Sequence, residues 1–171
     1  MSKELTRPDR DARRIREQYW DTEVGTQIPV NPATIAEGLG IAIEWDDSMT
    51  GADHGCLDPN NGHPVIRLSR DQGLNRRRFT VAHELGHYCQ EMYNGDLDNL
   101  QPHHRNETSA LGTEPDEVYA NGFAAELLMP AFAVTQLVSD GLVLGELAQR
   151  FAVSTEAMTH RLNNLGLTAS V

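Results

Sequence analysis

Cysteine is scarce in this sequence of 171 residues, and its shortage narrows the possible folds. The two cysteines, Cys56 and Cys89, could form at most one disulfide, and neither belongs to a C-x-x-C motif. A scaffold held together by several disulfides is therefore excluded. We interpret both residues as ordinary thiols rather than as zinc ligands or redox groups.

Long apolar stretches are missing as well. No run approaches the roughly 20 consecutive apolar residues that a membrane-spanning helix needs. The segment from Met1 to Arg16 is densely charged where a secretory signal would have an apolar centre. We therefore expect the protein to act in the cytoplasm and not at a membrane.

Positive charge is also in short supply. The 14 lysines and arginines are outnumbered by 25 aspartates and glutamates, which gives a net charge of −11 and a pI of about 4.9. Most non-specific binding to nucleic acid comes from attraction between basic side chains and phosphates. The overall charge therefore disfavours a DNA-binding protein.

Apolar residues make up 39% of the sequence and recur at regular spacings, as is typical of a folded domain. We expect an α+β fold with one main domain, in which a small, mostly antiparallel three-stranded sheet packs on a helical core. The expected helices cover residues 8–19, 32 to 38 or 40, 75–91, 115–128, 144–151 and 154–165, and the expected strands cover 41–45, 54–57 and 64–68.

Residues 92–116 show no clear periodicity and are expected to form a loop. A loop of this length inside a compact domain is usually functional or mobile. It is therefore a candidate cover for a site nearby.

The strongest motif is H-E-x-x-H, formed by His83, Glu84 and His87 within an expected helix. Residues four apart on a helix differ by only about 40° around its axis, so both imidazoles can reach one metal ion. Glu84 is offset around the helix, where it can reach a water on the metal without coordinating the metal itself. The spacing predicts a catalytic metal site with Glu84 as the base.

A third metal ligand has to come from elsewhere in the chain, because a hydrolytic zinc site usually has three protein ligands and an open position for water. Glu117 is the best candidate, since it opens the next strong helix, and Glu114 and Asp116 are its rivals. Asn121, one helical turn after Glu117, could accept the N–H of a ligating histidine and fix its tautomer. One catalytic Zn²⁺ is the default ion, although manganese or iron could use similar ligands.

Other residues of suitable chemistry are assigned less specific roles. A structural zinc would want a fourth ligand, usually sulfur, and Cys89 projects about 200° away from His87 around the helix. Tyr88 and Tyr93 could donate protons, but packing is the expected role for both. The histidines outside the motif are expected to be exposed or locally hydrogen-bonded, with oxyanion stabilisation as the alternative: His54, His63, His103, His104 and His160.

Two stretches of this sequence resemble the ImmA/IrrE family of metallopeptidases. They are RRFTVAHELGH at residues 77–87 and EVYANGFAAELLMP at residues 117–130, and the likeness extends over most of the chain from Pro32 onward. The resemblance implies zinc ligands at His83, His87 and Glu117 and a base at Glu84. Many relatives have a histidine shortly after the second ligand, where this chain has Gln90-Glu91, a difference that affects no ligand.

The resemblance also implies a substrate. It is a helix-turn-helix transcriptional repressor of a prophage, mobile element or stress-response locus, which a zinc-dependent endopeptidase would cleave. The alternative is a non-proteolytic regulator that binds a repressor or toxin partner through the same fold.

Residues 146–162 look like a helix-turn-helix, whose second helix would be the recognition element. Residues 131–171 contain only two arginines and no lysine, so packing or partner docking is favoured over DNA binding. We expect residues 1–130 to form the metallopeptidase domain and residues 131–171 to form a helical appendage packed on it.

Overall fold

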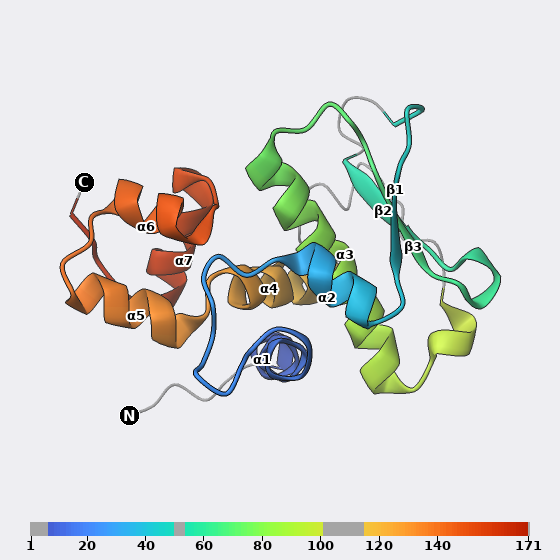
Figure 1. Cartoon of the computed structure of the whole chain (residues 1–171), viewed down its shortest axis with the longest axis horizontal. Coiled ribbons are helices and arrows are strands. Elements are labelled where there is room, and N and C mark those ends of the chain that lie inside the picture. The colour runs from blue at the N-terminus through green and yellow to red at the C-terminus, as the bar shows by residue number, and fades with distance from the viewer. Residues whose placement is uncertain (1–6, 50–53, 101–114, 171) are drawn as a thin grey trace.

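A computed structural model describes residues 7–49, 54–100 and 115–170 of the chain. It has the expected α+β class, with helices gathered around a small sheet (Figure 1). In chain order the elements are α1 (Arg7–Tyr19), α2 (Pro32–Gly38), β1 (Ala42–Trp45), β2 (Gly55–Asp58), η1 (Asn60–Gly62), β3 (Val65–Leu68), α3 (Leu74–Asn94), η2 (Leu97–Asn99), α4 (Pro115–Leu128), α5 (Ala131–Ser139), α6 (Leu144–Phe151) and α7 (Thr155–Leu165).

The three-stranded sheet is mixed, with strand order β1-β3-β2. β2 and β3 form an antiparallel hairpin, whereas β1 runs parallel to β3. The hairpin loop contains Asn60, Asn61 and Gly62, all with positive φ, which these residue types tolerate well. Because the hairpin occupies one edge of β3, β1 joins at the other edge, and the sheet has one parallel and one antiparallel pair.

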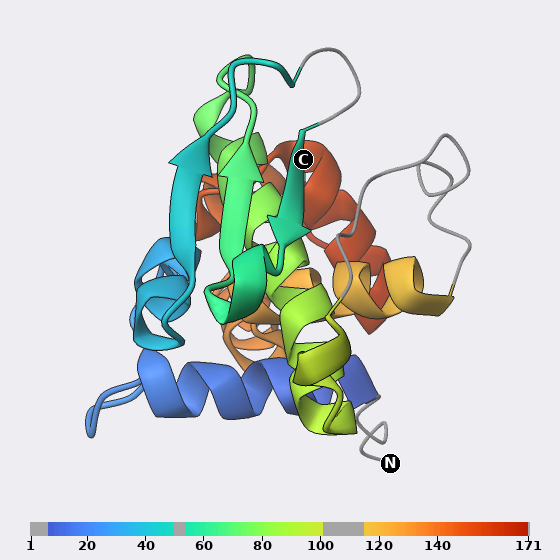
Figure 2. The ribbon, with the colours of Figure 1, turned by 90° about the vertical axis from the view of Figure 1, so that its right-hand side faces the viewer.

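The helix α3 is the centre of the fold. It lies behind the sheet, while α1 crosses at one end of it (Figure 2). Val81, Ala82, Leu85 and Cys89 of α3 are buried in the hydrophobic core. α3 ends at Gly95, whose φ of 76° is a left-handed conformation that glycine adopts without strain. These features fix the helix on which the H-E-x-x-H motif lies.

The helices α5, α6 and α7 gather at the end of the molecule away from the sheet, and α4 links them to α3 (Figure 1). α5 was not among the expected helices, because Pro130 was compatible with either the end of one helix or the start of another. It begins one: the carbonyl oxygen of Pro130 accepts hydrogen bonds from Ala133 N and Val134 N, each at 3.0 Å.

A buried group of charges connects three helices from different parts of the chain. Glu126 of α4 lies between Arg16 of α1 and Arg161 of α7. Arg161 also donates from Nε to the carbonyl oxygen of Met129 at 2.9 Å. All three charged side chains are buried, so this cluster lies where α1 and α7 pack against α4.

Among the residues described, no single helix has the length and apolar character needed to cross a membrane. The bent pair α4 and α5 meets that test by length and composition when the two are taken together.

Candidate metal centre

The close approach of α3 and α4 creates the site. Gly86, inside the H-E-x-x-H motif, lies against Ala120 of α4. A Cβ added at Gly86 would be 2.9 Å from Ala120 Cα and 3.1 Å from the Ala120 carbonyl oxygen. Only glycine allows the helix backbones to come this close without displacing one of them. The contact brings the first turn of α4 next to the two motif histidines.

Three side chains converge where the helices meet. His83 Nε2 and His87 Nε2 are 3.1 Å apart. Glu117 places Oε2 3.3 Å from His83 Nε2 and Oε1 3.3 Å from His87 Nε2. All three residues are buried, and they form a group of donor atoms, within 4.8 Å of one another, that could hold a metal ion.

The donor set and its spacing fit zinc. Ligands about 2.0–2.1 Å from a tetrahedral ion lie about 3.3 Å from one another. The separations of 3.1 and 3.3 Å among the two imidazoles and the carboxylate agree with that value. Two histidines and one glutamate also form one of the usual ligand sets of hydrolytic zinc.

Asn121 fixes the orientation of one imidazole. Its Oδ1 lies 3.0 Å from His83 Nδ1, so it accepts a hydrogen bond when that nitrogen carries the proton. The lone pair of His83 is then on Nε2, the nitrogen that faces His87 and Glu117. Asn121 thus lies within hydrogen-bond distance of a motif histidine, and its role as an outer-shell partner stays a prediction.

The surroundings favour the ionised form of Glu117. Without a metal ion, and with protons on the Nε2 atoms that face it, His83 and His87 donate hydrogen bonds to Glu117. These bonds lower the pKa of this carboxyl well below its ordinary range, and they outweigh the opposing effect of burial. A carboxylate held in the charged form is suited to bind a cation.

Glu84 lies on the sheet side of the trio. It is buried, and its charge contributes to raising the pKa of Cys56 on β2 to about 11, an increase caused mainly by burial of the thiol. Cys56 is therefore a protonated, ordinary thiol. Glu84 therefore lies near enough to the edge strand β2 to influence Cys56.

The rival third ligand Asp116 does not join the trio. Its side chain is turned to Gln90, whose Nε2 donates to Asp116 Oδ1 at 2.7 Å. Glu114, the other rival, lies outside the described residues, as do His103 and His104. Cys89 is fully buried in the hydrophobic core, and burial raises the pKa of its thiol.

The remaining candidates lie apart from the trio. Tyr88 and Tyr93 are partly buried and pack against the hydrophobic core. His63 is exposed on the hairpin loop, and the carbonyl oxygen of His54 accepts a hydrogen bond from Ser69 N. His160 is exposed on α7, where it lines a groove.

The model of the IrrE N-terminal-like domain, a peptidase family, matches residues 36–163, from α2 to α7. The chain belongs to this family. The matched region contains His83, Glu84, His87 and Glu117, so the ImmA/IrrE resemblance drawn from two short stretches is confirmed over most of the chain.

Two characterised relatives of this IrrE-like chain carry the name radiation response metalloprotease IrrE. The protein of Deinococcus deserti is 34% identical over 116 residues, which are 66% of this chain and 40% of that protein. The protein of Deinococcus radiodurans is 32% identical over 112 residues, 63% of this chain and 33% of that protein. The match thus spans well under half the length of either relative.

A solved structure shares the fold of this IrrE-like chain. It is a Mycobacterium tuberculosis transcriptional regulator, with a TM-score of 0.62, 24% sequence identity, and coverage of 91% of this chain and 46% of that one. The likeness concerns the fold alone.

Proposed function

We propose that this chain is a zinc-dependent endopeptidase, with one Zn²⁺ held by His83, His87 and Glu117 and with Glu84 as the base. The observation that carries the proposal is the convergence of two imidazoles and one carboxylate on a single point beside a second buried carboxylate. Membership in a metallopeptidase family supports it.

The side chains divide the chemistry between them. When bound, zinc supplies Lewis acidity, which acidifies water and polarises a carbonyl. Glu84 takes the proton from the attacking water and passes it to the leaving amine. Asn121 keeps His83 in the tautomer that presents Nε2 to the ion.

The edge strand β2 is suited to hold the substrate backbone. β3 is the central strand and has no free edge, whereas β2 is one of the two edge strands of the sheet. β2 pairs on one side with β3 and lies next to α3, where Gly55 approaches Thr80. A peptide added as an extra strand at β2 would pass beside Glu84, with main-chain hydrogen bonds that tolerate varied sequences.

We infer from the family resemblance that the substrate is a helix-turn-helix transcriptional repressor. A substrate of this class implies that the activity takes place in the cytoplasm.

We also propose that residues 1–130 form the metallopeptidase domain and residues 131–171 an appendage packed on it. The buried bonds of Arg161 to Glu126 and Met129 support that arrangement.

The test is cleavage of the helix-turn-helix protein encoded next to this chain's gene, with zinc content measured in the same samples. Glu84→Gln should lower turnover by about 10²- to 10⁴-fold while zinc stays bound. Glu91→Gln, a carboxylate two helical turns further along α3, is the matched control and should cleave like the native chain. Full activity in the Glu84 variant would remove Glu84 as the base, and no cleavage by the zinc-loaded native chain would favour the non-proteolytic regulator.

A further inference from the structure

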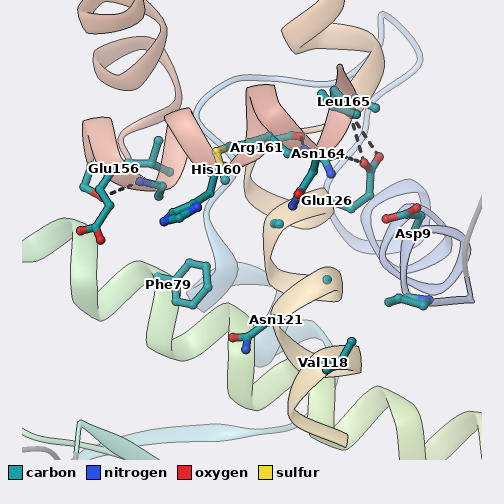
Figure 3. A pocket seen from close by; sticks show the side chains of 18 of the residues that line it. Asp9, Phe79, Val118, Asn121, Glu126, Glu156, His160, Arg161, Asn164 and Leu165 are labelled. Carbon is teal, nitrogen blue, oxygen red and sulfur yellow. Dashed lines mark hydrogen bonds and ion pairs between the residues drawn. The ribbon is translucent and has the colours of Figure 1, made fainter. Parts of the chain in front are cut away.

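A groove of about 1210 Å³ lies next to the metal centre, between α3, α4, α7 and the start of α1 (Figure 3). Small residues of α4 form its floor, among them Gly122 and Ala125, and Phe79 of α3 and His160 of α7 stand on its walls. Small-molecule sites usually measure about 300–1,000 Å³. The size of the groove and its position across three helices fit a polypeptide segment better than a small ligand.

The groove reaches the metal centre through two residues. Asn121 lines it and also lies 3.0 Å from His83 Nδ1. Phe79 lines it too, and its ring centroid is 6.4 Å from that of His83. Val118, the neighbour of Glu117, adds an apolar side chain that is 55% exposed. A chain bound in this groove would therefore lie against the side of His83 that carries Nδ1, one imidazole ring away from the point where the three ligands meet.

The wall formed by α7 is unsuited to DNA. α7 is the helix that the sequence pattern marks as a recognition helix, and Glu156 and His160, one turn apart, face the groove (Figure 3). α7 has no lysine and a single arginine, Arg161, which is buried and bonded to Glu126 and to the carbonyl oxygen of Met129. α7 thus offers no exposed arginine or lysine to a phosphate backbone.

We propose that this groove binds the polypeptide substrate on one side of the scissile bond, with α7 as a recognition wall for protein rather than for DNA. The proposal rests on the peptidase function proposed above. An apolar substrate side chain would pack against Phe79 and Val118, and polar side chains such as His160 would bond to the substrate backbone. An apolar centre with a polar rim is typical of surfaces that bind other polypeptides.

The first test fills the groove. His160→Trp adds bulk on the groove wall, and Thr159→Trp is the matched control, since Thr159 is exposed on the same helix but does not line the groove. The probe is a proteome-derived peptide library, with cleaved bonds identified by mass spectrometry. His160→Trp should lower cleavage at least about tenfold and change residue preference on one side of the scissile bond, while Thr159→Trp stays within about twofold of the native chain.

The second test does not depend on turnover. A photo-crosslinking amino acid is placed at position 160 or 159 of the zinc-loaded Glu84→Gln chain, and the same library is added. Crosslinks should form at 160 in several-fold excess over 159. If the native chain cleaves the library but both positions crosslink equally and both tryptophan variants cleave normally, the groove proposal is overturned and the peptidase function stands.

Two further outcomes separate the proposals. Crosslinking at 160 without cleavage by the native chain would support the groove and reject the peptidase function. Crosslinking at 160 to duplex DNA or to a second copy of the chain, in preference to peptides, would overturn the groove proposal.

Discussion

Two buried glutamates stand near opposite ends of α4, and their surroundings give them different roles. Glu117, at the N-terminal end, faces His83 and His87. Glu126, near the C-terminal end, faces Arg16 and Arg161. Both carboxylates are at least nine-tenths buried and both contact groups from other helices.

The difference lies in the partners. Imidazoles have lone pairs that can turn to a metal ion, whereas guanidinium groups are permanent donors with none. The pKa of Glu117 is lowered by its hydrogen bonds to the histidines, whereas burial raises the pKa of Glu126 despite the opposing charge of Arg161. Burial of a carboxylate therefore does not by itself indicate a metal site, and the partner decides between a ligand and a structural ion pair.

The strongest test of this comparison is Glu126→Ala. It would leave Arg161 and Arg16 buried without their carboxylate and should lower the free energy of unfolding by about 3–5 kcal/mol. Denaturant unfolding of the metal-free chain measures it, and Glu37→Ala, at an exposed position of α2, is the control. A loss similar to that of the control would show that the cluster does not hold α7 on α4.

Glu117→Gln should act on the metal and not on the helix packing. Loss of outer-shell partners typically costs 10- to 100-fold in metal affinity, so loss of a ligand charge should cost more than about 100-fold. Competition with a chelator measures the affinity. The control is Asp116→Asn, which removes the adjacent carboxylate and should leave zinc binding unchanged; the reverse result would make Asp116 the ligand.

Gly86→Ala tests the close approach of α3 and α4, which concerns the Glu117 region and not the Glu126 region. The new Cβ would press on the Ala120 backbone, which should cost about 1–3 kcal/mol of stability and weaken zinc binding, because α3 and α4 must separate. Gly145→Ala is the control, since a Cβ there meets nothing within 4 Å. If Gly86→Ala binds zinc as tightly as the control, the close approach is not what assembles the site.

The smallest expected effect is on the pH dependence of stability without metal. Because the pKa of Glu117 is lowered from 4.5 in the folded state, this residue stabilises the fold above about pH 4.5, and the contribution is lost as the pH falls. The pKa of Glu126 is raised in the folded state, so this residue has the opposite effect on stability. As the pH falls, the folded chain takes up the proton before the unfolded chain does, and the fold gains stability. In unfolding titrations between about pH 3.5 and 6, Glu117→Gln should make the acid-side loss shallower and Glu126→Gln should make it steeper. Equal slopes in both variants would contradict the assignment.

The sequence was sufficient for the parts of the protein that depend on local spacing. The H-E-x-x-H motif, the helix that holds it and the turn that places Asn121 after Glu117 are all set by helical periodicity. The α+β class and the family also followed from the sequence, because alternating patterns, caps and two contiguous stretches indicate them. The parallel pairing of β1 with β3 did not, since a strand's own pattern does not choose its neighbour.

Tertiary structure decided what depends on contacts between distant segments. Glu117 faces the histidines and Asp116 does not, because Gly86 and Ala120 fix how α4 crosses α3. Glu126 carries no local mark that separates it from an exposed helical glutamate, and its role comes from Arg16 and Arg161, which are far away in the chain. Local sequence determined which chemical groups are present and on which helical face, whereas the close packing of the helices determined which of those groups meet.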